Sequence, residues 1–239
     1  MMVRFLASVR SPHEALAALQ NGADIIDLKE PASGALGRLD PPKIAACLAA
    51  VAGQREVSAT IGDMPLDPEK VVTAVDAMAA TGVDIVKLGI FEGEADATLD
   101  RLSPLARAGV RLVAVFFADR APDFRLLGRC AEAGFLGVML DTAAKGSGSL
   151  TTHLRLSRLE DFISTGRRHG LLTGLAGSLR EGDIDALLPL KPDYLGFRSA
   201  LTRGSRADAL DPGLVRRIAN KLATATAGAQ SAAVGAAPV

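Results

Sequence analysis

Short apolar runs alternate with stretches of helical periodicity along nearly the whole of this 239-residue chain. Such runs are typical of strands buried on both faces, and the stretches between them have the spacing of amphipathic helices. A regular series of this kind predicts a single α/β domain, a closed (β/α)8 or TIM barrel, rather than a doubly wound open sheet. The expected strands are residues 5–9, 25–28, 56–61, 84–88, 111–117, 136–140, 171–175 and 194–197.

Capping residues mark where the first and last helices begin. Ser11 and Pro12 are typical of an N-cap and a first helical position, and Asp211 with Pro212 starts the last helix in the same way. We expect that helix to end near Ala223, where the composition becomes Ala, Gly, Ser and Thr. These residues cannot bury enough apolar area to order themselves. The predicted organisation is a barrel over residues 1–224 and a disordered tail over 225–239.

Composition narrows the possible functions. Lys and Arg together number 27, as do Asp and Glu, so the balanced charge argues against a nucleic-acid partner. No signal peptide precedes the first strand and no apolar run approaches the ~20 residues of a membrane span, so we expect a cytoplasmic protein without membrane contact. Cys47 and Cys130 read as buried core thiols, and the histidines share no metal-ligand spacing. We expect neither metal nor cofactor, and a homo-oligomer.

The segment around the second strand carries the first candidate chemistry. Asp27 and Lys29 share one face of this strand because side chains two residues apart point the same way. Burying an ion is costly unless it is paired, so this arrangement needs a reason. One interpretation is a structural ion pair that closes the strand end. The other is a catalytic lysine held beside an acid.

Charged residues end two further even-numbered strands. Lys87 ends the fourth strand, Asp141 follows the sixth, and Lys145 lies in the loop beyond. Catalytic residues of such barrels lie at the carboxyl ends of the strands, so these side chains should meet Asp27 and Lys29 on one rim. The cluster suggests imine formation, which requires a neutral lysine. A nearby cation and burial would lower the lysine pKa and the aspartates would raise it, and sequence leaves that balance open.

Glycine and serine follow the last two strands, where this fold commonly binds phosphate. Arg198 or Arg203 could add a charge there, although glycine at a strand end also serves tight packing. No Gly-x-x-x-x-Gly-Lys-Ser/Thr segment is present, which argues against a nucleoside triphosphate. The candidate phosphate-binding residues are Gly177, Ser178, Gly196, Arg198 and Ser199.

Several segments resemble the (5-formylfuran-3-yl)methyl phosphate synthase family over nearly the whole chain except its tail. They are residues 6–12, 22–31, 86–89, 139–146 and 174–179, and the Asp-x-Lys-Glu-Pro and Asp-Thr-x-x-Lys-Gly motifs are the most specific. The resemblance implies a lyase that joins two molecules of glyceraldehyde 3-phosphate, with loss of phosphate and water, to make a furan precursor of methanofuran-type cofactors. The family's Schiff-base lysine falls on Lys29, its proton-accepting lysine on Lys87, and its other site residues on Asp27, Asp141 and Lys145.

Two alternatives stay open at this point. One is a class I-type aldolase or transaldolase acting on triose phosphates, which would use the same imine chemistry. The other is a barrel that binds phosphorylated metabolites without turning them over, since this fold supports many functions.

Overall fold

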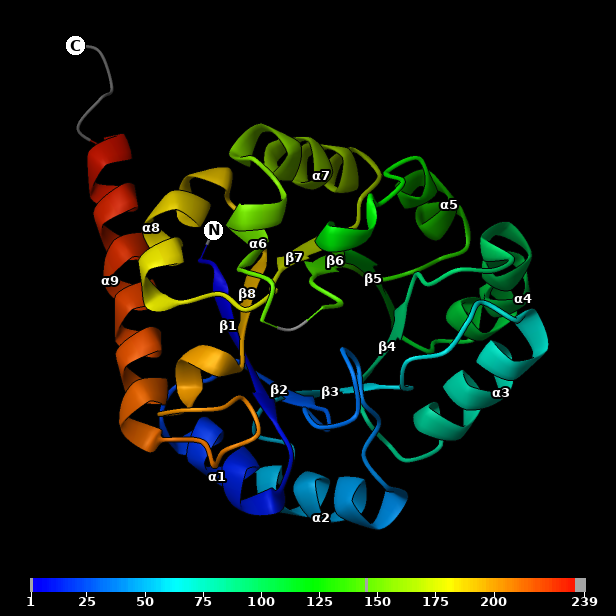
Figure 1. The fold of residues 1–239 in the computed structure, drawn as a ribbon, viewed down its shortest axis with the longest axis horizontal. Helices are drawn as coiled ribbons and strands as arrows, with labels where there is room; N and C mark the ends of the chain where they lie inside the picture. Colours follow the sequence, from blue (N-terminus) through cyan, green and yellow to red (C-terminus); the bar gives the residue numbers. More distant parts are fainter. Residues whose placement is uncertain (1, 145, 235–239) are drawn as a thin grey trace.

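Eight parallel strands close into a barrel in the order of the sequence (Figure 1). The computed structural model describes residues 2–144 and 146–234. This architecture confirms the predicted TIM barrel. The strands are β1 Arg4–Val9, β2 Ile25–Leu28, β3 Glu56–Thr60, β4 Ile85–Gly89, β5 Leu112–Phe117, β6 Gly137–Asp141, β7 Leu172–Leu175 and β8 Tyr194–Phe197.

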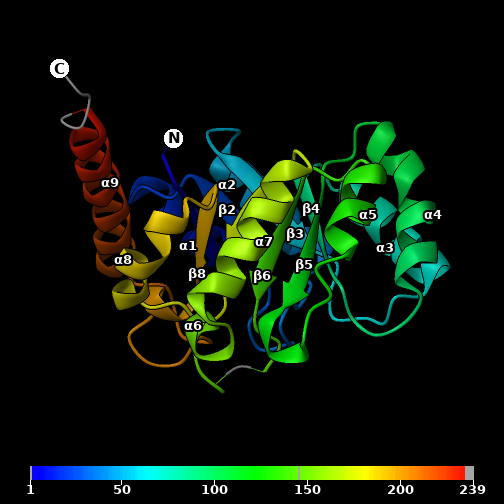
Figure 2. The ribbon, with the colours of Figure 1, turned by 90° about the horizontal axis from the view of Figure 1, so that it is seen from above.

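Helices surround the barrel on its outside, as both ribbon views show (Figure 2). None of the described helices combines the length and apolar character needed to cross a membrane. The α-helices are α1 Pro12–Gln20, α2 Pro41–Val51, α3 Pro68–Ala79, α4 Ala95–Arg107, α5 Leu126–Glu132, α6 Leu150–His153, α7 Leu156–Arg168, α8 Ile184–Leu187 and α9 Pro212–Val234. Short 3-10 turns are η1 Ala118–Arg120, η2 Glu181–Asp183, η3 Leu188–Leu190 and η4 Ser199–Leu201.

Two helices differ from the prediction. Helix α6 lies in a polar stretch rich in Gly, Ser and Thr whose pattern does not predict a helix. It is fixed there because Leu150 is buried and the N–H of Leu150 donates to the carbonyl of Gly177 at 2.8 Å. Helix α9 continues to Val234, past the expected end near Ala223, which accords with the high helix propensity of alanine. Residues 235–239 of the expected tail lie outside the described part of the chain.

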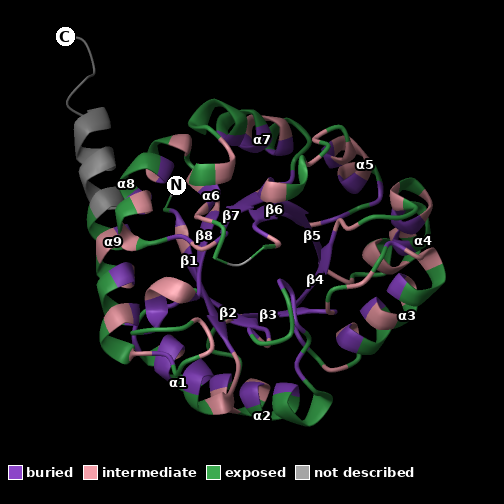
Figure 3. Cartoon of the chain, viewed as in Figure 1, coloured by how far each residue is buried: buried purple, intermediate pink, exposed green. Residues whose placement is uncertain are grey.

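The interior of the barrel has an apolar part and, toward the carboxyl ends of the strands, a polar part. Apolar residues inside the barrel, among them Leu6, Ile85 and Tyr194, form one buried cluster, and the apolar residues between the strands and the helices form another. Figure 3 shows that the strands are buried along most of their length. The polar part follows from the strand register, because Ser8 pairs with Asp27 and Asp27 pairs with Ser58 across β1, β2 and β3. Inward-facing positions at one height therefore bring two hydroxyls to either side of one carboxylate.

Candidate active site

Asp27 and Lys87 form a buried ion pair in the polar part of the barrel. Lys87 Nζ lies 2.6 Å from Asp27 Oδ1, and the two residues are 2% and 0% exposed. The hydroxyl of Ser58 donates to Oδ1 at 2.8 Å and that of Ser8 donates to Oδ2 at 2.9 Å. Asp27 is thus held by one ammonium and two hydroxyl groups.

The charge states of this pair follow from burial and from their neighbours. Burial alone would raise the pKa of the Asp27 carboxyl, but the charges of Lys87 and Lys29 and the hydrogen bonds hold that pKa below its usual value. Burial lowers the pKa of Lys87, Asp27 opposes this effect, and the nearby charge of Lys29 reinforces it. Lys87 consequently releases its proton more readily than an ordinary lysine.

Lys29 pairs with the other aspartate. Its Nζ lies 3.6 Å from Asp141 Oδ2, and Asp141 Oδ1 accepts the N–H of Thr142 at 2.7 Å. The expected neighbour of Lys29 on its own strand, Asp27, is instead the partner of Lys87. Asp27 and Lys29 are two positions apart on one strand, which separates their Cα atoms by about 7 Å along the strand axis. Each of the two lysines pairs instead with a carboxylate from a different strand.

A narrow hollow opens at the carboxyl ends of the strands, and we call it the inner hollow. Lys29 and Asp141 line it, while Lys87 does not. Its free volume is about 20 Å³, roughly enough for one water molecule. Lys29 is therefore the amine that an arriving molecule meets first. All the candidate phosphate residues line it as well: Gly177, Ser178, Gly196, Arg198 and Ser199.

Gly177 and Ser178 form a backbone cradle after β7. Their φ angles are +107° and +50°, and Ser178 is one of few residues other than glycine in the left-handed region. A Cβ on Gly177 would lie 2.9 Å from Thr142 Cγ2, so no side chain fits there. Within the described part of the chain, no hydrogen bond uses the N–H of either residue. Consecutive N–H groups in such a conformation make a concavity that suits an anion.

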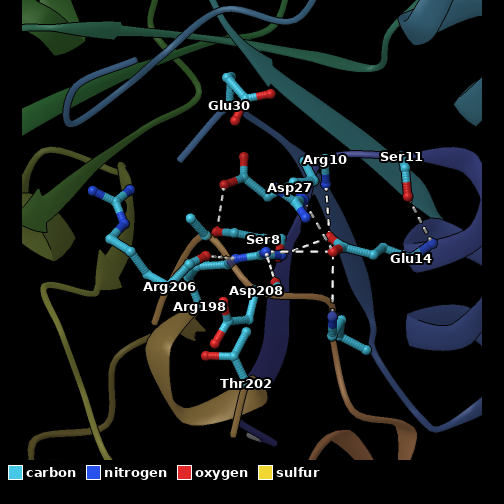
Figure 4. Close-up of polar contacts among 12 residues, drawn as sticks. Ser8, Arg10, Ser11, Glu14, Asp27, Glu30, Arg198, Thr202, Arg206 and Asp208 are labelled. Carbon is cyan, nitrogen blue, oxygen red and sulfur yellow. Dashed lines mark hydrogen bonds and ion pairs between the residues drawn. The ribbon is translucent and has the colours of Figure 1, made fainter. Parts of the chain in front are cut away.

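The guanidinium of Arg198, for which the sequence suggests a phosphate clamp, is enclosed by protein. NH1 donates to Glu14 Oε2 at 2.6 Å and to the carbonyl of Ser8 at 3.1 Å, and NH2 donates to Glu14 and to the carbonyl of Asp208. Its Nε donates to the carbonyl of Arg206 at 2.7 Å. Figure 4 shows this guanidinium between Glu14 and the loop after β8. Arg198 therefore fixes the wall of the hollow, and every donor group has a protein acceptor.

Arg206 is the site cation that sequence reasoning missed. Its side chain is half-buried, lines the inner hollow, and points away from Glu14 in Figure 4. Burial lowers the pKa of Arg206, and Asp141 opposes that effect. The sequence signal was weak, since Arg203 lies in the same loop and forms an ion pair with Asp211 instead. Arg206 differs from Arg203 in that it lines the inner hollow and its carbonyl is bound by Arg198.

The remaining candidates have different positions. Gly196 is required for packing, because a Cβ there would lie 3.0 Å from Met139 Cε and 3.1 Å from the Ala176 Cβ. Ser199 begins η4 at the edge of the hollow. Lys145 lies outside the described residues. In the described ranges, no group of three or more His, Cys, Asp or Glu side chains is arranged to hold a metal ion.

Two solved structures with a similar fold are, by their titles, an isomerase and a synthase. Phosphoribosyl anthranilate isomerase from Thermus thermophilus matches with a TM-score of 0.65 and 18% identity, over 93% of this chain and 99% of that one. The 3-hexulose-6-phosphate synthase from Salmonella typhimurium matches with a TM-score of 0.65 and 16% identity, over the same shares. At these identities the likeness concerns the fold alone.

Sequence comparisons identify the family. A (5-formylfuran-3-yl)methyl phosphate synthase from Methanopyrus kandleri is 36% identical over 93% of this chain and all of its own length. A Methylorubrum extorquens protein, to which the same name is assigned provisionally, is 44% identical over 87% of this chain and 86% of its own. The sequence model of 4-HFC-P synthases matches residues 5–219, which include all eight strands except Arg4 at the start of β1. The chain is therefore an enzyme of the 4-HFC-P synthase family.

Proposed function

We propose that this enzyme converts two molecules of glyceraldehyde 3-phosphate into (5-formylfuran-3-yl)methyl phosphate, one phosphate and two waters, through an imine on Lys29. The observation that carries the proposal is the placing of two lysines of different character at one barrel mouth. Lys29 lines the inner hollow beside a backbone cradle, and Lys87 lies buried with a lowered pKa. The names of the relatives supply the product, and the resemblance supplies the triose substrate and the methanofuran-type cofactor that it serves.

In this scheme the imine forms on Lys29 because its amine, unlike that of Lys87, lines the inner hollow, which widens from its volume of about 20 Å³ to admit a triose. One triose phosphate is first isomerised to dihydroxyacetone phosphate, whose ketone then condenses with the Lys29 amine and releases the first water. Asp141, 3.6 Å from Nζ, is placed to carry protons to and from the nitrogen. The phosphate of this triose occupies the cradle at Gly177 and Ser178, where N–H groups and the charge of Arg206 meet it.

Because Lys87 is buried and does not line the inner hollow, the hollow has to open toward it when glyceraldehyde 3-phosphate binds. Lys87 then supplies the base that removes the proton from C2 of this triose. Its lowered pKa increases the neutral fraction, and Asp27 holds its Nζ at a fixed position. The resulting enediol has two outcomes. Protonation at C1 gives the ketone used above, and expulsion of phosphate from C3 gives the enol of a three-carbon ketoaldehyde.

The carbon skeleton of the product determines where the new bond forms. The furan carbon that bears the phosphomethyl group is bonded to three other carbons, so it corresponds to the imine carbon. The methylene carbon of the enol attacks this carbon, and the electrons of the C=N bond move to the Lys29 nitrogen. A linear hexose skeleton, which an ordinary aldol addition produces, does not contain such a branch.

Ring closure then completes the balance. The free hydroxyl of the ketone-derived half adds to the neighbouring ketone, the resulting hemiketal loses the second water, and the Lys29 amine leaves with formation of the other ring double bond. Asp141 and Lys145 carry these later proton transfers in the proposed scheme. The aromatic ring makes the sequence effectively irreversible.

Trapping and product analysis test the proposal. Borohydride with dihydroxyacetone phosphate should add one triose mass to the peptide that contains Lys29, and Lys29→Arg should abolish both this adduct and the furan. Lys87→Ala should slow furan formation roughly 10²–10⁴-fold, as is typical of losing a general base, while the adduct still forms. An adduct on Lys87 or Lys145 would contradict the assignment, and a linear hexose bisphosphate as the product would identify an aldolase instead.

A further inference from the structure

A second hollow adjoins the inner hollow on the side of the β6–α6 and β8–α9 loops, and we call it the outer hollow. It has a volume of about 420 Å³ and is lined by three serines, three glycines and two arginines, Arg180 and Arg206. None of its described lining residues carries a carboxylate. Such a wall, with small polar groups and only positive charge, has the chemistry of an anion site.

The two arginines of the outer hollow are available to a ligand. No ion pair among the described residues uses Arg180, and Arg206 makes only a long 3.4 Å contact with the carbonyl of Gly34. Two arginines in the adjacent loop and helix are already paired, Arg203 with Asp211 and Arg217 with Glu181. By contrast, neither Arg180 nor Arg206 forms an ion pair with a carboxylate in the described part of the chain.

The two hollows share one wall. Ser178, Ser199 and Arg206 line both of them. Arg206 is fixed at this boundary because its carbonyl accepts from Arg198 Nε at 2.7 Å. A group bound in the outer hollow would therefore lie next to one bound at Lys29.

We propose that the outer hollow is a second phosphate-binding site, which holds the phosphate of the triose that is not attached to Lys29. This inference rests on the proposed function, in which two phosphorylated trioses meet and one phosphate leaves. Arg180 binds the leaving phosphate, and Arg206 lies between the two phosphates and contacts both. The retained phosphate stays on the backbone cradle of the inner hollow, and the expelled phosphate leaves through the wider outer hollow.

Titration with inorganic phosphate tests the site without any turnover. Isothermal titration calorimetry should give two phosphates per wild-type chain and one per Arg180→Ala chain, because the side chain removed is exposed and its loss leaves the inner cradle intact. Arg180→Lys should keep the second site with weaker affinity. Arg203→Ala is the matched control, an arginine on the same rim whose change should leave two sites. One phosphate per wild-type chain, or an unchanged count in Arg180→Ala, would overturn the proposal.

Kinetics separate this proposal from the proposed function. With dihydroxyacetone phosphate saturating, Arg180→Ala should need roughly 10–100-fold more glyceraldehyde 3-phosphate, the loss expected for one charged hydrogen-bonded contact. In Arg180→Ala, the concentration of dihydroxyacetone phosphate that gives half-maximal trapping on Lys29 should stay as in wild type. Arg206→Ala should raise both this concentration and the concentration of glyceraldehyde 3-phosphate that turnover requires. An equal loss of trapping in Arg180→Ala would mean a single shared site. Two phosphates without any furan product would instead refute the proposed function and leave the second site standing.

Discussion

The charge state of Lys87 depends on burial and on three charged neighbours. Burial lowers its pKa, Asp27 raises it, Lys29 lowers it, and Asp141 raises it to a smaller extent. Asp27→Asn removes the larger of the two influences that raise the Lys87 pKa, so this pKa should fall further. The activity that requires neutral Lys87 increases as pH rises through that pKa, and this limb of the pH–rate profile should therefore move to lower pH in the variant.

The profile of kcat against pH, measured for wild type and Asp27→Asn, checks this expectation. The maximal rate should also fall, since Asp27 positions the ammonium at 2.6 Å. Ser58→Ala offers a comparison, because it removes one hydrogen bond to Asp27 but leaves its charge. A limb that moves to higher pH in Asp27→Asn would contradict the assignment of Lys87 as the base.

Gly177 permits a comparison between backbone strain and site geometry. Gly177→Ala combines a φ of +107° with a Cβ 2.9 Å from Thr142, whereas Gly109→Ala has a φ of +103° and open space around its Cβ. Both variants should lose about 1–3 kcal/mol of stability from the strained conformation. Only Gly177→Ala should raise KM, roughly tenfold or more if a charged hydrogen bond to phosphate is lost. Equal KM values in the two variants would place the phosphate elsewhere.

Strand periodicity predicted the residues of the site better than it predicted their partners. Asp27, Lys29 and Lys87 could be placed on one rim because alternation fixes which strand residues face inward. Lys29 pairs with Asp141 and Lys87 with Asp27 because of the register between the barrel strands, and a local sequence pattern does not predict that register. Arg206 was missed for a similar reason, since a loop arginine acquires its position only from a carbonyl contact with Arg198.

Helix α1 and the loop after β8 are joined by one buried ion pair. The side chains of Glu14 and Arg198 are 4% and 5% exposed, and Arg198 also donates to three backbone carbonyls. Arg198→Met removes the closer of the two arginines paired with the buried Glu14 carboxylate and leaves only Arg10, whose Nε lies 3.4 Å away. Breaking a buried ion pair typically costs about 3–5 kcal/mol. We expect a lower free energy of unfolding by urea titration and, because the loop carries Arg206, a higher KM.

An exposed pair supplies the control for this prediction. Arg101→Met breaks the contact with Glu69 on the solvent side of α3 and α4, and surface pairs of this kind contribute about 0–1 kcal/mol. A similar loss in both variants would show that Arg198 is no more important to the fold than a surface arginine. Unchanged KM in Arg198→Met would show that the loop keeps its place without it.

At the level of elements, capping signals were reliable where they were local. Ser11 accepts the N–H of Glu14 at the start of α1, as expected of an N-cap. Helix α6 has no comparable signal, because it is stabilised by burial of Leu150 and by a contact with the β7 loop. Elements that depend on a distant contact were the ones that the sequence pattern did not reveal.

For the whole molecule, the apolar core predicts how much of the C-terminus the fold needs. Helix α9 buries Val215, Ile218 and Leu222. Truncation after Thr224 keeps all three, so melting temperature and activity should remain close to those of the full chain. Leu222→Ala should lower stability by about 2–5 kcal/mol, as is typical for a buried leucine. A large loss on truncation alone would show that the residues beyond Thr224 dock against the barrel or a second copy.

Two lysines pair with two aspartates at the barrel mouth, so these four groups, which we propose to be catalytic, carry no net formal charge. A neutral, buried set of this kind exerts little long-range pull on a phosphorylated substrate, and dissolved ions hardly reach it. The phosphorylated substrate is then attracted mainly by the rim arginines Arg180 and Arg206, whose charges dissolved anions can screen. Raising the ionic strength should therefore increase KM while kcat stays nearly constant, so chemistry and capture respond to the solvent separately.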